Sequence, residues 1–372
     1  MTIGFVLDDT LDRPDGVQQY VLTLGTWLTR RGHRVFYLTA HTARTDVPEV
    51  YSLGNFARFN FNGNAVRTPL PASSARIRKL LHELHPDVLH VQMPYSPLLA
   101  ERVIMNASAR TAIVGTFHIL PLARIQFAAN RLLALVLRRS LGRFQVVMAV
   151  SPPAADFARR VYGLSPQVVP NAVDLARFKA APRPHRDREH VTVLFMGRLV
   201  ERKGVLELIR AFRQLPPEVA AITRLVIGGD GRLAARARNL AGTAPNIEFA
   251  GFVPEDHKAG FLAAADIAVF PSTAGESFGI VLVEAIAAGA GVVLAGHNPG
   301  YASVLGAGSA ALINPADTQA FARRLAHFIN NADTRDQLHE VQRQLVSRFD
   351  IHTVGPQIEA IYQQVLTSRP TE

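Results

Sequence analysis

Residues 191–231 read VTVLFMGRLVERKGVLELIRAFRQLPPEVAAITRLVIGGDG. The apolar run 191–196 predicts a buried strand, the amphipathic stretch 205–214 predicts a helix, and 224–227 predicts a second strand. A glycine-containing loop follows each of the two strands. A strand, a helix and a strand in this order imply two parallel strands that are joined by a crossover helix.

The same alternation continues in both directions from this stretch. Further short apolar runs of strand character lie at 3–7, 35–39, 88–91, 113–117, 146–150, 247–249, 267–270 and 291–295. The pattern predicts an α/β protein with two doubly wound, Rossmann-like domains. We expect an N-terminal domain over residues 1–170 and a second domain over 171–352. The helical C-terminal stretch within 353–372 could pack back on the first domain.

Composition excludes several classes of protein. The chain has 372 residues, 48% of them hydrophobic, which is too many for a disordered chain. It has no cysteine, so a disulfide framework, a thiolate zinc site and a cysteine nucleophile are excluded. No stretch reaches 18 uncharged apolar residues, and the N-terminus MTIGFVLDD lacks the positive charge of a signal peptide. We therefore expect a soluble cytoplasmic protein.

The formal net charge of +10 is unevenly distributed. Residues 1–170 carry 19 Lys and Arg against 10 Asp and Glu, whereas residues 171–372 carry 21 against 20. A basic first half suggests contact with a polyanion or an anionic membrane surface. Ordinary solvated surface charge explains the same numbers, and charge alone leaves both interpretations open.

Two residues in the first half lie where ligands of such sheets bind, after the end of a strand. Gly16 stands at the entry to the first expected helix, where a phosphate could approach the backbone, or where the chain merely turns. His118 follows the strand 113–117 and could hydrogen-bond a sugar hydroxyl or a developing charge. A lone histidine is more often a structural residue.

A cationic loop follows the strand 191–196. Gly197 and Gly204 enclose the three cations Arg198, Arg202 and Lys203. Arginine forks and a lysine point charge both suit a diphosphate, although a solvated surface loop has the same composition. The lysine is slightly informative because the chain has 36 Arg and only 4 Lys.

The most specific stretch is 275–284, GESFGIVLVE, in which seven residues separate Glu276 from Glu284. The N–H groups of Gly279, Ile280 and Val281 would point out of a helix N-terminus toward an anion. Glu284 lies in an otherwise apolar helix and should have a partner, because an unpaired buried charge is costly. The alternative is a purely structural salt bridge.

With this block the chain resembles the retaining glycosyltransferases of family 4, which have the GT-B fold of two facing Rossmann-like domains. Within the family it is most similar to the actinobacterial phosphatidylinositol mannosyltransferases. The resemblance runs nearly end to end, and the paired-glutamate block is its most specific part. The shorter matching stretches, in the same order, are 15–18, 88–90, 116–118, 149–151 and 170–174.

The resemblance implies a sugar-nucleotide donor, GDP-mannose first among them, and no covalent nucleophile. Arg198 and Lys203 would hold the pyrophosphate and assist its departure, Glu276 would hold the hydroxyls of the transferred sugar, and Glu284 would hold the ribose hydroxyls. The catalytic residues would be His118, Arg198, Lys203 and Glu276. The donor-binding residues would be Gly16, Lys258, Gly279, Ile280, Val281, Leu282 and Glu284, with Lys258 near the base. A divalent ion such as Mg²⁺ is possible, but the sequence shows no ligand cluster for it.

For the acceptor, the resemblance implies a phosphatidyl-myo-inositol lipid at the inner face of the cell membrane, bound through Gln18, Asn62 and Arg67. The helical stretch 74–84 places the cations Arg76, Arg78 and Lys79 beside an apolar stripe, so it could lie on an anionic bilayer or simply face the core. A second basic stretch, 124–139, allows the same two interpretations.

Some positions depart from the family pattern. Asp15 stands where the relative has a second glycine, and Ile119 and Leu120 replace polar residues after His118. These departures affect the acceptor more than the family, so a UDP-sugar or another lipid or soluble acceptor remains an alternative. A polyanion-binding protein without enzyme activity is a further alternative, but it leaves both glutamates unexplained and lacks the interleaved aromatic residues of nucleic-acid binders. No nucleic-acid partner is expected.

Overall fold

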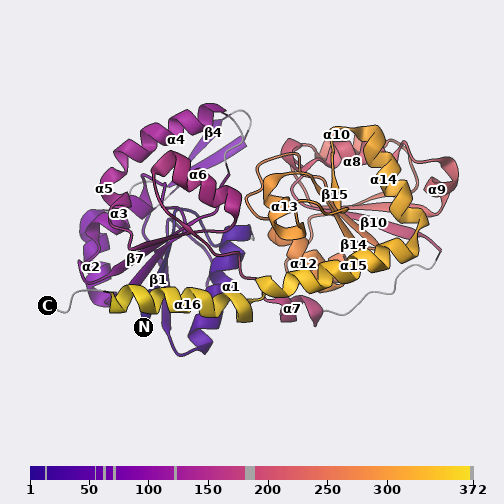
Figure 1. Ribbon diagram of the computed structural model, residues 1–372. Helices are drawn as coiled ribbons and strands as arrows, with labels where there is room; N and C mark the ends of the chain where they lie inside the picture. Colours follow the sequence, from indigo (N-terminus) through magenta and orange to yellow (C-terminus); the bar gives the residue numbers. More distant parts are fainter. Residues whose placement is uncertain are drawn as a thin grey trace. The chain divides into compact units, whose positions relative to one another are not determined.

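The computed structural model describes residues 1–12, 15–54, 56–61, 64–69, 73–120, 124–180 and 189–368; for 56–61, 64–69 and 124–127 it describes the backbone alone. The chain forms two compact units (Figure 1). Unit 1 comprises Met1–Ala172 together with Ile351–Glu372, and unit 2 comprises Val173–Asp350. Among the described helices, none is long and apolar enough to cross a membrane.

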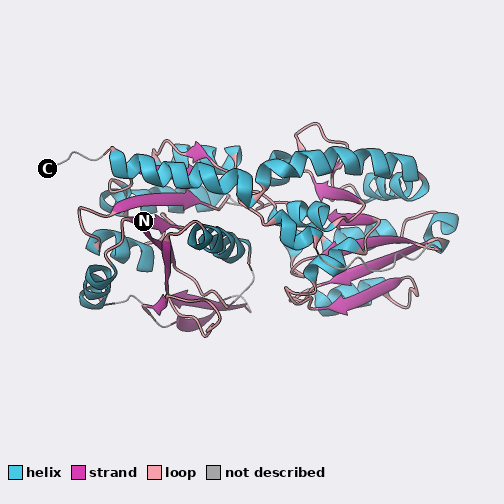
Figure 2. Cartoon of the chain, turned by 90° about the horizontal axis from the view of Figure 1, so that it is seen from below, coloured by secondary structure: helices cyan, strands magenta, loops and turns pink. Residues whose placement is uncertain are grey.

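Unit 1 is built on a parallel seven-stranded sheet in the order β3-β2-β1-β6-β7-β8-β9, with helices on both sides (Figure 2). Its strands are β1 Thr2–Leu7, β2 Arg34–Thr39, β3 Val50–Ser52, β6 Val88–Val91, β7 Ala112–Phe117, β8 Val146–Ala149 and β9 Gln167–Val168. Its helices are α1 Gly16–Arg30, α2 Ser74–Leu84, α3 Leu99–Asn106, α4 Arg124–Val136, α5 Arg138–Leu141, α6 Pro152–Tyr162 and α16 Ile351–Thr367. A separate antiparallel pair consists of β4 Phe56–Phe61 and β5 Asn64–Pro69.

The central strands of unit 1 are buried along almost their whole length because helices cover both faces of the sheet. β1 pairs in parallel with β2 on one side and with β6 on the other. The strand order therefore reverses between β1 and β6. The loops that follow these two strands diverge at this point, which makes it the expected ligand edge of the unit.

The C-terminal helix α16 packs against α1 and β7 of unit 1. Gly355 allows the close approach, since a Cβ at this position would lie 2.9 Å from the ring of Trp27. Glu359 accepts hydrogen bonds from Arg31 at 3.2 Å and from His33 at 2.8 Å. The last helix of the chain is thus held by both apolar packing and ion pairs.

Unit 2 repeats the scheme with a parallel six-stranded sheet in the order β12-β11-β10-β13-β14-β15. Its strands are β10 Val191–Met196, β11 Thr223–Gly228, β12 Ile247–Gly251, β13 Ile267–Phe270, β14 Val292–Gly296 and β15 Leu312–Ile313. Its helices are α7 Leu175–Lys179, α8 Val205–Phe212, α9 Pro217–Ala221, α10 Ala234–Ala241, α11 Lys258–Ala263, α12 Ile280–Ala288, α13 Pro299–Leu305, α14 Thr318–Asn330 and α15 Ala332–Val346. Two short 3₁₀ turns, Glu201–Lys203 and Ser347–Phe349, complete it. The order reverses between β10 and β13.

The expected α/β class with two doubly wound parallel sheets is confirmed. Some elements differ from the expectation. No helix start was predicted near Lys258, which is the first residue of α11. The apolar stripe of α2 faces the core, because Ile77, Leu81 and Leu84 belong to a buried cluster with β1, β2 and α3. Of the two interpretations of this stripe, core packing is the one that the structure shows.

Candidate functional site

The switch point of unit 2 joins the cationic loop to the first of the paired glutamates. The loop after β10 carries Arg202 and Lys203, and the loop after β13 carries Glu276. Arg202 Nη1 lies 2.6 Å from Glu276 Oε1, and Lys203 Nζ lies 2.8 Å from the same oxygen. The three side chains thus meet at the edge of the sheet where ligands of doubly wound domains bind.

The charges in this cluster hold Glu276 in its ionised form. Burial alone would raise the pKa of Glu276, but the charges of Lys203 and Arg202 outweigh it and lower this pKa. Burial lowers the pKa of Lys203, and the nearby charges of Arg202 and Arg198 act in the same direction. Two cations contact one carboxylate and the charge of Arg198 acts on Lys203, so the cluster is positively charged overall. Such a cluster suits a ligand with several negative charges, such as a diphosphate.

Glu284, the second of the paired glutamates, is buried in α12 and has a specific partner. Lys258 Nζ lies 2.6 Å from Glu284 Oε1, and their side chains are 10% and 3% exposed. Glu255 approaches the same ammonium at 3.6 Å. The requirement that a carboxylate in this apolar helix be paired is therefore met by the first residue of α11.

Helix α12 begins shortly after Glu276, in the same loop. Gly279 is the residue before the helix and has a φ of 118°, in the region that favours glycine. A Cβ there would lie 2.6 Å from the ring of Tyr301, whose hydroxyl is 3.0 Å from Ser272 Oγ. The amide of Leu282, which was expected to face an anion, already donates to Gly279 O at 3.0 Å. The first helical turn therefore uses this amide internally.

Gly204 fixes the distance between the two loops of the switch point. It has a φ of 73°, and a Cβ on it would lie 2.0 Å from the carbonyl oxygen of Pro271. Gly204→Ala is expected to lower the free energy of unfolding by at least ~2 kcal/mol, because backbone strain and a backbone clash add. Gly306→Ala is the control, since Gly306 has a φ of 89° but no heavy atom within 4 Å of its Cβ position. Equal losses in urea unfolding of the two variants would contradict the packing role.

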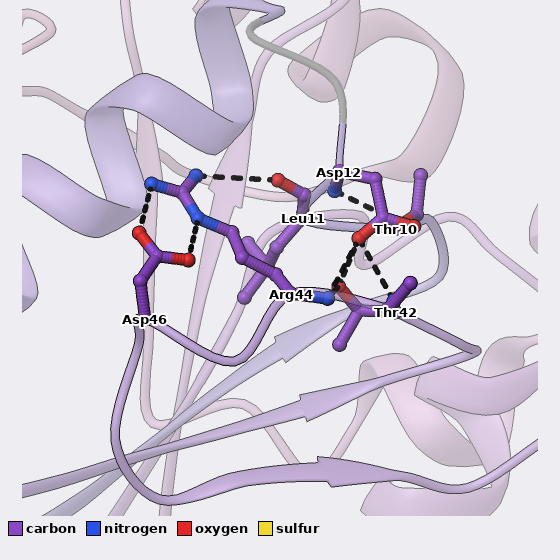
Figure 3. A network of polar contacts seen from close by, with 7 residues as sticks. Thr10, Leu11, Asp12, Thr42, Arg44 and Asp46 are labelled. Carbon is purple, nitrogen blue, oxygen red and sulfur yellow. Dashed lines mark hydrogen bonds and ion pairs between the residues drawn. The ribbon is translucent and has the colours of Figure 1, made fainter.

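At the switch point of unit 1, the loop after β1 is fixed to the loop after β2. Asp12 Oδ1 accepts hydrogen bonds from Thr42 Oγ1, from Ala43 N at 2.9 Å and from Arg44 N at 3.1 Å, and Arg44 in turn pairs with Asp46 (Figure 3). Burial raises the pKa of Asp12, but the hydrogen bonds together outweigh it and lower this pKa. The loop that leads to Gly16 and α1 is thereby anchored.

Gln18 and His118 lie buried at this edge of unit 1. Gln18 donates from Nε2 to the carbonyl oxygen of Thr10 at 3.1 Å. His118 Nε2 lies 2.8 Å from Gln92 Oε1, so this nitrogen carries the proton when the imidazole is neutral. Burial lowers the pKa of His118 to about 3, and the ring is neutral at pH 7. A neutral ring here can hydrogen-bond a substrate hydroxyl without adding charge.

The same edge contains a buried carboxyl group that sequence analysis missed. Asp8 follows β1; the hydroxyl of Ser96 donates to Oδ2, and the amide of Ala100 donates to Oδ1 at 2.6 Å. Burial raises the pKa of Asp8 to about 7, against the effect of the Ala100 amide. Asp8 thus connects β1 to the N-terminal turn of α3.

Deeper in unit 1, His90 connects the sheet to α16. Its Nδ1 lies 2.7 Å from the hydroxyl of Tyr362, and its Nε2 lies 2.6 Å from Thr116 Oγ1. Burial, and to a smaller extent the proximity of His118, lowers the pKa of His90 to about 3. Because this folded-state pKa lies below the unfolded value, the ring's contribution to stability is complete above about pH 6.5. It is lost as the pH falls toward 3.

His90→Gln is therefore expected to weaken the acid sensitivity of the fold. Between about pH 6 and pH 4, the free energy of unfolding of the variant should fall less steeply than that of the parent, by about 1.4 kcal/mol per pH unit. Urea unfolding at several pH values measures both slopes. His257→Gln is the control, because the His257 side chain is 76% exposed. Parallel curves for the parent chain and His90→Gln would contradict the assignment.

Some of the expected residues are not placed in a site by the structure. Asn62 lies outside the described residues, and of Arg67 only the backbone is described. On α2, Arg76 donates to the carbonyl oxygen of Ser52 at 3.1 Å, and Arg78 donates to Asn106 Oδ1 at 3.3 Å. Lys79 lies 3.9 Å from Glu83. In the described part of the chain, no group of three or more His, Asp and Glu side chains could hold a metal ion.

Comparisons with known proteins match both halves of the chain. The family described as "Glycosyltransferase Family 4" matches residues 14–177, and that described as "Glycosyl transferases group 1" matches residues 178–345. A phosphatidyl-myo-inositol mannosyltransferase of Mycolicibacterium smegmatis is 33% identical over 98% of this chain and 94% of that protein. A phosphatidyl-myo-inositol mannosyltransferase of Propionibacterium freudenreichii is 31% identical over 99% of this chain and 97% of that protein. The chain belongs to family 4 of the glycosyltransferases.

Solved structures assign the GT-B fold to this family 4 glycosyltransferase. HepE of Anabaena, in complex with UDP and glucose, superposes with a TM-score of 0.77 at 21% identity, covering 98% of this chain and 100% of that chain. Sucrose-phosphate synthase of Thermosynechococcus elongatus gives a TM-score of 0.76 at 19% identity, with 99% and 100% covered. At these identities the likeness concerns the fold.

Within this glycosyltransferase, the structure brings four of the individually expected site residues together in two pairs. Lys203 meets Glu276 and Lys258 meets Glu284, while the charge of Arg198 is close enough to affect Lys203. Sequence analysis noted Arg202 only as a loop cation and missed its contact with Glu276. It also missed Gln92, although this residue follows a predicted strand as His118 does. The position after a strand was the available signal.

Proposed function

We propose that this chain is a retaining mannosyltransferase that transfers mannose from GDP-mannose to a phosphatidylinositol-type lipid at the inner surface of the cell membrane. The observation that carries the proposal is the cluster of Arg202, Lys203 and Glu276 at the switch point of unit 2. The names of the relatives support the specific substrates. Besides the two above, a relative of Mycobacterium tuberculosis, 26% identical over 88% of this chain, is a GDP-mannose-dependent phosphatidylinositol dimannoside mannosyltransferase.

The cationic cluster would act on the departing diphosphate. Breaking the bond between sugar and nucleotide leaves negative charge on the diphosphate oxygens, and preorganised cations stabilise that charge as it develops. Arg198 and Lys203 would supply this charge, with the amides of Gly279, Ile280 and Val281 at the N-terminus of α12. Because the Leu282 amide is engaged with Gly279 O, we leave it out of this set.

The two glutamates would hold hydroxyl groups at different places on the donor. Glu276 is ionised, and a carboxylate accepts hydrogen bonds from the hydroxyls of the transferred sugar. Glu284 would accept from the ribose hydroxyls. Lys258 keeps one oxygen of Glu284 in place at 2.6 Å and would lie near the base. The pairing therefore orients the carboxylate before the nucleotide arrives.

Unit 1 would supply the acceptor side. Gln18, Asn62 and Arg67 would bind the phosphoinositol head group. Gly16 would serve the donor instead, with its backbone amide toward the diphosphate. His118, buried and neutral, would line the reaction centre. Arg76, Arg78 and Lys79 would face anionic lipid from α2, whose apolar side is used by the core.

Nucleotide binding tests the donor. The melting temperature of the purified protein should rise more with GDP than with UDP at equal concentration, because a ligand that binds only the folded state stabilises it. GDP-mannose and UDP-glucose, offered together with phosphatidylinositol vesicles, should yield only mannosylated lipid by mass spectrometry. A larger shift with UDP, together with glucosylated product, would replace the proposed donor by a UDP-sugar.

A further inference from the structure

Helix α4 exposes an apolar face that the core of unit 1 does not use. Leu132, Leu135 and Val136 are 66%, 71% and 66% exposed. The spacing i, i+3, i+4 puts them side by side on one face of the helix. Three of the eight exposed large hydrophobic residues of the described chain are thus gathered on this helix. Isolated exposed leucines need no explanation, but a contiguous exposed apolar patch marks an interaction surface.

The opposite side of α4 is firmly attached to unit 1. The helix packs against α6 and α5, as Figure 1 shows for α4 and α6. The hydroxyl of Tyr162 donates to Asn130 Oδ1 at 2.6 Å, and Leu137 just after the helix is fully buried. The outward face is therefore presented by a helix that is already fixed on its other side.

Exposed cations adjoin this apolar face on α4 and α5. Arg131, Arg138 and Arg139 are all exposed, and none of them forms an ion pair with a described residue. In the sequence, residues 102–155 contain seven arginines and no Asp or Glu. A protein partner whose surface carries charges of both signs would not explain why so long a stretch lacks acidic residues. The charge complements a continuous anionic surface.

The geometry points to the exposed face of α4 as the docking surface for an anionic lipid bilayer. Leu132, Leu135 and Val136 would enter the boundary between head groups and acyl chains, while Arg131, Arg138 and Arg139 meet lipid phosphates. α2 provides only cations, because its apolar side is buried, whereas α4 and the adjoining α5 together provide apolar anchors and cations. The inference deepens the proposed function and rests on it in one respect, that the acceptor is a lipid.

Vesicle flotation with the full chain tests the surface. Leu132→Ser/Leu135→Ser should reduce the fraction bound to vesicles of phosphatidylcholine and phosphatidylglycerol by about tenfold or more, since two exposed leucines lose their transfer into lipid. Arg138→Gln/Arg139→Gln should weaken binding to these vesicles in low salt and have little effect in high salt. Ile222→Ser/Val341→Ser, two exposed aliphatic positions of unit 2, is the matched control and should bind like the parent chain.

The readouts separate this inference from the proposed function. With a short-chain, water-soluble phosphatidylinositol as acceptor, Leu132→Ser/Leu135→Ser should retain the parent activity, whereas with vesicles it should lose it. If no acceptor is mannosylated while flotation follows the prediction, the proposed function fails and the docking surface stands. Undiminished vesicle binding of the double variant would overturn the inference. The inference would also be overturned if light scattering showed a dimer for the parent chain and a monomer for the double variant, because the apolar face would then join two copies of the chain.

Discussion

Glu276→Gln is expected to lower kcat for mannosyl transfer by about 10²- to 10³-fold, the cost typical of removing one preorganised polar group from a transition-state site. The carboxylate is held by Arg202 and Lys203 at 2.6 and 2.8 Å, and an amide cannot accept both of these charge-assisted hydrogen bonds with the same strength. Because Glu276 would hold the transferred sugar, which GDP lacks, the affinity for GDP should change far less than kcat. Steady-state kinetics and calorimetry measure the two effects.

Glu340→Gln is the control for this variant. Glu340 is also a glutamate of unit 2 in an ion pair, 3.2 Å from Arg343, but its side chain is 53% exposed. Exposed pairs of this kind contribute little to stability, so both activity and folding should be unchanged. Activity of Glu276→Gln within a factor of a few of the parent chain would remove Glu276 from the reaction.

Lys258→Met is expected to have the largest effect on stability. It leaves Glu284 buried without its partner, and breaking one side of a buried ion pair costs about 3–5 kcal/mol. Affinity for the nucleotide should fall as well, because nothing then orients the carboxylate. Urea unfolding measures the first effect, and GDP titration of the folded protein below the transition measures the second.

The double variant Lys258→Met/Glu284→Gln separates the structural role of this pair from its role in binding. Removing both charges should restore most of the lost stability, because no buried charge remains unpaired. Affinity for GDP should stay low, since the ribose has lost its carboxylate. If the double variant also regained the parent affinity, the pair would be a structural salt bridge and the assignment of Glu284 to the ribose would fail.

The sequence was sufficient for the fold because hydrophobic periodicity and glycine loops repeat with each strand and helix. Ten of the thirteen strands of the two central sheets fall close to their expected ranges, whereas β3, β9 and β15, of two or three residues each, were not predicted. Short elements were missed for lack of such a signal. α3 has only eight residues, and the pair β4 and β5 flanks Asn62 and Gly63, a dipeptide typical of hairpin turns that was interpreted only as part of an acceptor loop.

The sequence predicted many of the individual residues of the candidate site, but not which of them contact one another. Because an unpaired buried charge is costly, Glu284 was expected to have a partner. No sequence rule selects Lys258, however, which lies 26 residues away on another helix. Similarly, the loop composition pointed to a diphosphate, whereas only the switch between β10 and β13 brings Arg202 to Glu276. Strand order decides such contacts, and it is a property of the folded chain.

The central claim is that this family 4 glycosyltransferase moves mannose from a nucleotide to an inositol lipid. The most direct test incubates the parent chain and Glu276→Gln with GDP-mannose, labelled in the sugar, and vesicles that contain phosphatidylinositol, followed by extraction of the lipid. We predict label in the lipid fraction for the parent chain, in an alpha linkage to the inositol, and at most about a hundredth of that rate for Glu276→Gln. No labelled lipid with the parent chain, with or without Mg²⁺, would contradict the account.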